Sequence, residues 1–352
     1  MLNTKLTLMP KEKVINADYQ MKLVPGYTDE GKLSAQSKKE LEAMIKPSNG
    51  GFESNDSGEV SVESIRAAMG YKEARHTNQN QLKIVNTEYE KIKVRTYVQT
   101  QLVKQILPTI VFMHGGGFFG GSLDNVELPC EALADYGAVR VVSVDYSLAP
   151  EHPYPQNLLD CYQVLNYLGQ HKSDLGISDL IAMGDSAGGN LTYGLSLLDR
   201  RLGSNYLDKA IALYPVTYQG DNKLRRQEFD SPEPLIGQEN PADIRTFVNN
   251  FNSSNNLINQ WYLRDSDKES IYISPLNAPE DLLKKMPKTL FMVGEFDPLR
   301  LQGEAFYNKM KLAGGDITYI RYNGMTHAFM DKVGDFIQAD DALMEALKFI
   351  LN

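Results

Sequence analysis

The chain has 352 residues, of which 42% are hydrophobic and 23% charged, as is ordinary for a globular protein. The formal net charge of −9 argues against a nucleic-acid partner, and no window approaches the roughly 18 apolar residues of a membrane span. Residues 1–10 carry no apolar stretch followed by a small-residue cleavage site, so we expect no signal peptide and a cytoplasmic location. Cys130 and Cys161 lack metal-site spacing, and we expect both to be thiols.

Residues 1–77 differ in character from the rest of the chain. They carry scattered charge, a loop-like stretch at 47–51, and two short helical patterns at 35–46 and 61–69. Short amphipathic helices are marginally stable alone and need a surface to pack against. We therefore predict that this segment is part of a cap and not an independent domain.

From residue 81 onward, apolar strands alternate with helices. The predicted strands are a hairpin at 82–85 and 92–98, followed by 109–113, 139–144, 180–183, 210–213, 289–293 and 318–322. The predicted helices are 123–136, 157–170, one directly after 180–183, 302–312 and 339–350. This order predicts an α/β fold with a mainly parallel, eight-stranded sheet flanked by helices.

The alternation is interrupted once, after the strand at 210–213. Residues 218–272 contain no convincing core strand, but they carry a long helical stripe of apolar residues. An insertion after a parallel strand emerges at the carboxyl edge of the sheet, where sites in such folds lie. We predict a cap made of 1–77 and 218–272, on a core made of 78–217 and 273–352.

The stretch Gly-Asp-Ser-Ala-Gly-Gly at 184–189 joins a predicted strand to a predicted helix. Strand, sharp turn and helix form the context that a G-x-S-x-G nucleophile motif requires, which makes Ser186 the candidate nucleophile. We expect Asp185 to hold neighbouring loops in place. The alternative is a Gly/Ser turn with no chemical role.

A second stretch, His-Gly-Gly-Gly-Phe-Phe at 114–119, follows the strand at 109–113. Glycines there let backbone amides approach a substrate oxygen, and we predict an oxyanion hole made by Gly115, Gly116 and Ala187. A phosphate-binding loop is the alternative, but the run lacks both the GxGxxG spacing and a Lys-Ser/Thr ending. Phe118 and Phe119 either line the pocket or pack beneath the cap.

A serine nucleophile needs a base, usually a histidine that a carboxylate orients. Of the five histidines, His327 follows the last predicted strand, whereas His114 is better placed to brace the glycine loop. In this type of fold the acid lies between the serine and the histidine in the chain. Asp297, followed by Pro298, is the predicted acid, and Glu295 is the second choice.

Taken together, these stretches resemble the hormone-sensitive-lipase-like branch of the α/β-hydrolase fold, the bacterial family IV carboxylesterases. The resemblance covers residue 81 to the C-terminus apart from the insertion, and its further motifs are 146–155, 274–276, 297–300 and 324–329. It implies Ser186, His327 and Asp297 as the catalytic triad. Two departures are Leu301-Gln302, where acidic residues are usual, and Ala328, where glycine is more common.

The resemblance implies a serine carboxylesterase that hydrolyses short-chain acyl esters, acetyl to roughly hexanoyl, with no metal or organic cofactor. Members of such families occur as monomers and as homodimers, and both states stay open. The alternatives are a deacetylase of an acetylated sugar or small metabolite, and a receptor that binds a small molecule without turnover.

Overall fold

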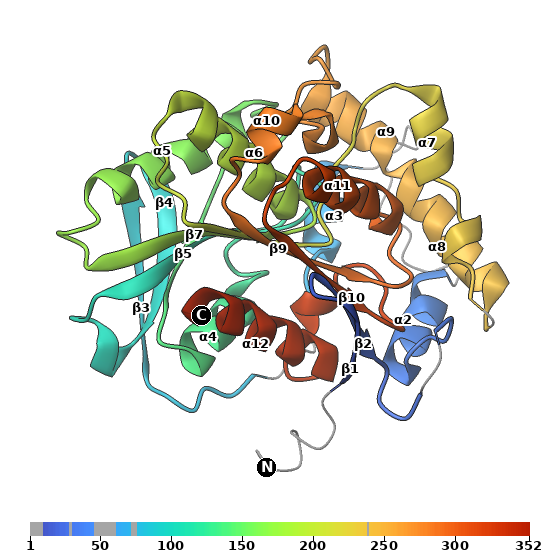
Figure 1. The fold of residues 1–352 in the computed structure, drawn as a ribbon, viewed down its shortest axis with the longest axis horizontal. Helices are drawn as coiled ribbons and strands as arrows, with labels where there is room; N and C mark the ends of the chain where they lie inside the picture. Colours follow the sequence, from blue (N-terminus) through green and yellow to red (C-terminus); the bar gives the residue numbers. More distant parts are fainter. Residues whose placement is uncertain (1–9, 28–29, 46–60, 72–75, 238) are drawn as a thin grey trace.

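A ten-stranded sheet forms the centre of the molecule (Figure 1). The structure, a computed structural model, describes residues 10–27, 30–45, 61–71, 76–237 and 239–352. The predicted loop at 47–51 and the predicted helix end at residue 46 lie outside these residues. The strands are β1 (Lys11–Asn16), β2 (Tyr19–Leu23), β3 (Leu82–Tyr89), β4 (Ile92–Gln99), β5 (Leu107–Met113), β6 (Arg140–Val144), β7 (Ile177–Asp185), β8 (Lys209–Leu213), β9 (Lys288–Gly294) and β10 (Ile317–Tyr322).

The strand order is β1-β2-β10-β9-β8-β7-β5-β6-β4-β3. The run from β2 through β10, β9, β8, β7 and β5 to β6 is parallel, and the pairs β1–β2, β4–β6 and β3–β4 are antiparallel. Strands such as β8 and β9 are almost wholly buried apolar runs, as expected for parallel strands covered on both faces. The predicted fold class is confirmed.

Helices cover both faces of this sheet. In Figure 1, α4 and α12 lie on one side, and α5, α6, α10 and α11 lie on the other. No helix in the described ranges is long and apolar enough to cross a membrane. The α-helices are α2 (Ala35–Ile45), α3 (Val62–Ala68), α4 (Glu127–Tyr136), α5 (Gln156–Gln170), α6 (Ala187–Leu202), α7 (Lys223–Phe229), α8 (Pro241–Ser253), α9 (Asn255–Leu257), α10 (Glu280–Leu283), α11 (Arg300–Leu312) and α12 (Ile337–Leu351).

Short helical turns complete the description of the helices. Four are 3₁₀ turns, namely η1 (Thr100–Leu102), η2 (Glu233–Leu235), η4 (Pro275–Asn277) and η5 (Phe329–Lys332), and η3 (Ile258–Leu263) is a π-helical turn.

The sheet has two strands more than the eight predicted from the sequence. The strands β3–β10 account for eight, and β1 and β2 of the N-terminal segment extend the sheet beyond β10. Every residue of β1 is exposed, and its sequence, Lys-Glu-Lys-Val-Ile-Asn, does not alternate between apolar and polar residues. Such a strand gives no hydrophobic signal and can only be found from its backbone pairing.

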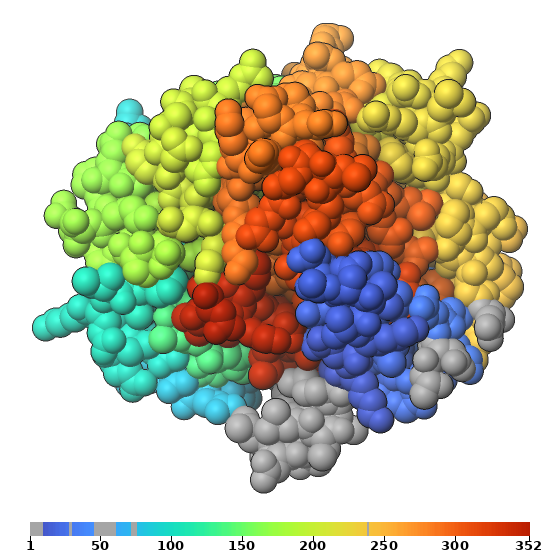
Figure 2. Space-filling model, in the orientation of Figure 1, coloured from blue at the N-terminus to red at the C-terminus, as the bar shows by residue number. Residues whose placement is uncertain are grey.

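We call helix α2, residues 61–71 with helix α3, and residues 218–237 and 239–272 the cap. Helix α2 packs against α8, although about two hundred residues separate them in the chain. One apolar cluster joins these helices to the core, and it consists of Leu33, Leu41, Leu235, Ile244, Phe247, Val248 and Phe296. Figure 2 shows the N-terminal segment, in blue, packed on the surface beside the C-terminal part of the chain.

Strand β2 is also tied to α12 by a buried charge cluster. Lys22, whose side chain is 5% exposed, places its Nζ 2.8 Å from Glu345 Oε1 and 3.5 Å from Asp341 Oδ2. The Tyr322 hydroxyl donates to Asp341 Oδ2 at 2.7 Å. Burial acts to lower the pKa of Lys22, but the carboxylates of Asp341 and Glu345 outweigh it, and the net shift is upward. The lysine is therefore held in its charged form.

We expect Lys22→Ala to lower the free energy of unfolding by about 2–4 kcal/mol, because it leaves two largely buried carboxylates without their cation. The exposed Lys11 of β1 provides the matched control, and Lys11→Ala should change the same quantity by less than about 0.5 kcal/mol. Urea denaturation measures both. Equal effects of the two substitutions would mean that the buried cluster does not hold β2 in place.

Candidate active site

Ser186 occupies a strained turn between β7 and α6. Its φ of 52° and ψ of −115° lie outside the regions that a non-glycine residue normally adopts. The turn is tight enough that a Cβ at Gly184 would lie 2.4 Å from Gly188 O. A Cβ at Gly188 would lie 2.0 Å from Met113 O. Only glycine fits at either position, and the close approach pushes the serine side chain away from the sheet.

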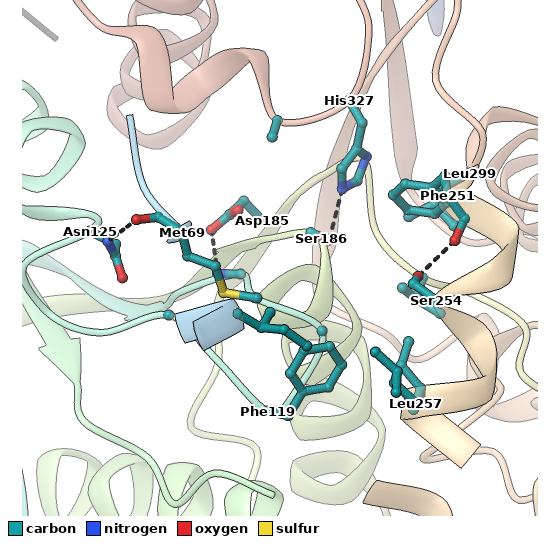
Figure 3. Close-up of a pocket in the computed structure, with 18 of the residues that line it drawn as sticks. Met69, Phe119, Asn125, Asp185, Ser186, Phe251, Ser254, Leu257, Leu299 and His327 are labelled. Atoms are coloured by element: carbon teal, nitrogen blue, oxygen red, sulfur yellow. Dashed lines mark hydrogen bonds between the residues drawn. The ribbon is translucent and has the colours of Figure 1, made fainter. Parts of the chain in front are cut away.

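The structure brings Ser186, His327 and Asp297 into one hydrogen-bonded chain. Figure 3 shows the bond between His327 and Ser186 at the pocket. Ser186 Oγ lies 2.9 Å from His327 Nε2, and His327 Nδ1 lies 2.8 Å from Asp297 Oδ2. Asp297 is fully buried, and its Oδ1 accepts the amide of Leu299 at 2.8 Å. The three residues follow β7, β9 and β10, so the parallel sheet gathers them at one edge.

The imidazole of His327 is also held by its neighbours. The rings of Tyr214 and Phe251 pack edge-on against it, with centroids 4.8 and 4.9 Å away. The next residue, Ala328, has a φ of 59°, a left-handed conformation that favours glycine. Glycine would meet this backbone requirement without strain, so the departure at Ala328 lies at a position that suits glycine.

Glu295, the second choice for the acid, points elsewhere. Its Oε1 accepts the amide of Gly31 at 2.7 Å, and its Oε2 accepts the amide of Gly324 at 2.9 Å. Both carboxylate oxygens are therefore used to tie the N-terminal segment to the loop that leads to His327. The geometry favours Asp297 as the residue that orients the histidine.

The structure corrects one member of the predicted oxyanion hole. The amide of Gly115 donates to Asp185 Oδ1 at 2.8 Å, so it is not available to a substrate oxygen. Within the described part of the chain, the amides of Gly116, Gly117 and Ala187 donate to no backbone or side-chain acceptor. Gly116 and Gly117 also line the pocket, and Ala187 begins helix α6 directly after the serine.

His114 and Asp185 hold the glycine loop from below. The His114 ring is fully buried, stacks on Tyr146 with centroids 4.3 Å apart, and has its Nδ1 2.7 Å from Gly115 O. Burial lowers the pKa of His114 to about 4, against a smaller opposing effect of its bond to Gly115. The ring is therefore neutral near pH 7 and braces the loop, as predicted.

A pocket of about 390 Å³ opens above Ser186. Of the two alternatives for these rings, Phe119 lines the pocket, whereas Phe118 is buried and packs beneath the cap, stacked on Tyr262 with centroids 4.2 Å apart. A positive φ of 70° at Phe118 turns its side chain toward the cap. Cap residues that line the pocket are Ile65, Met69, Gly70, Gln219, Phe251, Ser254, Asn255, Leu257 and Ile258.

Comparison with known proteins places this site in a family. A model of the alpha/beta hydrolase fold family matches residues 110–331, which is more than half of the chain and contains Ser186, Asp297 and His327. The chain belongs to this family. The family match, together with relatives named as carboxylesterases and acetyl esterases, confirms the resemblance that the motifs indicated.

Two relatives and one solved structure illustrate the match. The carboxylesterase NlhH of Mycobacterium tuberculosis (strain CDC 1551 / Oshkosh) is 30% identical over 68% of this chain and 72% of its own length. An acetyl esterase of Salmonella typhi is 29% identical over 76% of this chain and 78% of its own. A hyperthermophilic esterase from the archaeon Pyrobaculum calidifontis has a TM-score of 0.71 and 26% identity, covering 91% of this chain and 98% of its own.

The match to these relatives is not end to end. Across eight curated relatives, this alpha/beta hydrolase covers between 57% and 78% of the relative's length.

Among the described residues, no group of three or more His, Cys, Asp or Glu side chains is arranged to hold a metal ion. Cys130 and Cys161 are buried and not joined in a disulfide.

Sequence reasoning missed residues of this alpha/beta hydrolase that support the site from a distance. Gln302, one of the departures from the family pattern, accepts the amides of Thr217 and Tyr218 through its Oε1, at 2.7 and 2.9 Å. It thus fixes the point where the chain leaves β8 for the cap. No sequence signal identifies such a role, because a glutamine on a helix is normally a surface residue.

Arg66 of α3 was also missed, although it seats the cap on the glycine loop. Its Nε donates to Phe119 O at 2.7 Å, and its Nη2 donates to Ala149 O at 2.8 Å. Both terminal nitrogens also bond the carboxylate of Glu151, at 2.8 and 2.7 Å. This guanidinium lowers the pKa of Glu151 to about 2. The planar donor fork of arginine matches these acceptors in a way that lysine does not.

We expect Arg66→Ala to loosen α3, because the substitution removes the bonds that hold this seven-residue helix on the core. The amide hydrogen-exchange rates of α3 should rise about tenfold or more, while those of α8 stay within about twofold. Arg201→Ala, at an exposed arginine of α6, is the control and should change neither helix. Unchanged exchange in α3 would show that its apolar contacts suffice to seat it.

Proposed function

We propose that this alpha/beta hydrolase is a serine carboxylesterase that hydrolyses short-chain acyl esters, acetyl to about hexanoyl, by a Ser-His-Asp acyl-enzyme mechanism. At the level of the enzyme class the chain is a carboxylic ester hydrolase, since its family is hydrolytic and its named relatives are esterases. The observation that carries the finer proposal is the hydrogen-bonded chain from Ser186 through His327 to Asp297 at the pocket floor.

In the first step, Ser186 Oγ attacks the ester carbonyl as His327 Nε2 takes its proton. Asp297 fixes the ring so that Nε2 faces the serine, and it stabilises the imidazolium that forms. The imidazolium then protonates the alkoxide, which leaves as the free alcohol. The distance of 2.9 Å between Oγ and Nε2 is within reach of direct proton transfer.

The tetrahedral intermediate carries negative charge on the former carbonyl oxygen. In the proposed mechanism, the amides of Gly116, Gly117 and Ala187 donate to this oxygen, and the N-terminus of α6 adds a favourable dipole. Gly115 has no part in this, because its amide is bonded to Asp185. Loss of one such donor typically costs about 10²–10³ in rate.

In the second step, water takes the place of the alcohol. His327 removes a proton from the water as it attacks the acyl-enzyme carbonyl, and the same amides stabilise the second tetrahedral intermediate. Collapse of this intermediate releases the carboxylic acid and returns the proton to Ser186. Every proton transfer thus passes through one histidine, and the water supplies the proton that returns to Ser186.

The size of the pocket supports short acyl groups. A volume of about 390 Å³ lies near the lower end of the range for small-molecule sites. Several polar side chains, including Asn125 and Gln219, line the pocket together with apolar ones, which supports a deacetylase of a sugar or other small metabolite as the second candidate. A receptor without turnover has no use for a complete serine, histidine and carboxylate chain.

We expect Ser186→Ala to lower hydrolysis of p-nitrophenyl acetate at least about 10⁴-fold, and Asp297→Asn to lower kcat about 10³–10⁴-fold. Glu295→Gln should keep activity within about tenfold of the wild type, because the side chain serves as a loop brace and not as the orienting acid. Circular dichroism checks that all three variants fold. Retained turnover in Ser186→Ala would refute the nucleophile, and a larger loss in Glu295→Gln than in Asp297→Asn would exchange the two carboxylates.

We expect kcat/KM for p-nitrophenyl esters to be highest between C2 and C6 and to fall at least about tenfold by C10, because longer chains exceed the pocket. Leu257→Ala removes a cap side chain from the pocket wall and should move the optimum toward longer chains. The matched control is the exposed Leu224 of α7, since Leu224→Ala should leave the profile unchanged. A wild-type optimum at C8 or above would overturn the short-acyl proposal.

A further inference from the structure

The mechanism leaves one pocket carboxyl group without a role. Asp331 belongs to η5, four residues after His327, and lines the same pocket as Ser186. The residue as a whole is only partly buried, but its Oδ1 is buried without a hydrogen-bond partner, and its Oδ2 likewise accepts no bond from any described residue. A buried acceptor without a donor destabilises the folded protein, because the group has lost its bonds to water. An unpaired acceptor in a pocket wall therefore calls for an explanation, such as a donor on a bound ligand.

The basic side chains near Asp331 are already engaged with other carboxylates. Lys332 Nζ bonds Glu40, and the His327 ring bonds Asp297. Burial raises the pKa of Asp331 to about 6, against the opposing effects of Lys332 and His327. The pocket wall thus carries a carboxyl group with no cation of its own.

Asp331 lies close enough to Asp185 for the charges of the two carboxyl groups to interact. Burial and the charge of Asp331 raise the pKa of Asp185, which makes the two carboxyl groups electrostatic neighbours. Figure 3 shows Asp185 and Asn125 on one side of Ser186, with Phe251 and Leu257 on the other. An ester seated on the serine therefore has apolar side chains on one side, and Asp185, Asn125 and the apolar Met69 on the other.

We propose that Asp331 is a specificity-determining residue that accepts a hydrogen bond from a hydroxyl or ammonium group on the ester substrate. The substrates of this class are short esters that carry a donor near the scissile bond, such as esters of polyols or hydroxy acids. This inference rests on the proposed esterase function. A site built to bond a donor rejects the analogue that lacks it, because the buried acceptor is then left unpaired.

Two pairs of esters, matched in shape, test the proposal. In 2-hydroxyethyl acetate and propyl acetate, a hydroxyl replaces a methyl on the alcohol part. In ethyl 3-hydroxybutanoate and ethyl 3-methylbutanoate, the same exchange is made on the acyl part. The readout is the hydroxyl-to-methyl ratio of kcat/KM within each pair, which cancels any general effect of a substitution on the catalytic groups.

We expect Asp331→Leu to lower this ratio about tenfold or more in at least one pair, mainly through a higher KM for the hydroxyl ester. Leucine has the same branching, with methyl groups in place of the two oxygens, and therefore no acceptor, while Asp331→Asn keeps one acceptor oxygen and should give an intermediate ratio. Asp281→Asn removes an exposed negative charge on α10 and should leave both ratios at the wild-type value. If Asp331→Leu does not fold, the asparagine variant carries the test with a smaller expected change.

Ratios within twofold of the wild type in both pairs would overturn the proposal, and they are the result expected if an ordered water satisfies Asp331 instead. This outcome is distinct from failure of the proposed function. Hydrolysis of propyl acetate by the wild type and its loss in Ser186→Ala test the esterase assignment, whatever the ratios show.

Discussion

The site depends on one steric constraint, the close approach of the turn around Ser186 to the strand beside it. A Cβ at Gly188 would lie 2.0 Å from Met113 O, so the turn can close only where side chains are missing. The amide of Ser186 in turn donates to Leu213 O at 2.9 Å, which fixes the strained serine to β8. Strain of this kind persists only where surrounding structure enforces it, and here two neighbouring parallel strands do so.

Most of the core could be predicted from the sequence, because buried parallel strands are uninterrupted apolar runs bounded by glycine-rich turns. The strand predicted at 180–183 was recognised this way, although the pairing extends it to Ile177–Asp185. The edge strand Lys11–Asn16 could not be predicted, since all six of its residues are exposed. Its existence depends on hydrogen bonds to Tyr19–Leu23, and those depend on tertiary structure that a local pattern does not encode.

Residues of the candidate site could be predicted where their position in the chain fixes which edge of the sheet they reach. They could not be predicted where the role of a residue depends on the direction in which a side chain or an amide points. Ser186, Asp297 and His327 each follow a strand of one parallel sheet, so topology alone brings them to a common edge. The role of Gly115 could not be read from the sequence, because it depends on where the Asp185 carboxylate points. Phe118 is a similar case, since a positive φ turns its ring out of the pocket.

The apolar cluster under the cap has a consequence for how a substrate enters. Leu33 and Leu41 come from the N-terminal segment, Ile244 and Phe247 from the insertion, and Phe296 from the loop beside Asp297. Neither portion of the cap can move outward without exposing apolar surface of the other portion to water. We therefore expect that substrate entry requires a concerted displacement of both cap portions. Because Phe296 belongs to the cluster, such a movement would also shift the packing beside Asp297, the residue that orients the imidazole.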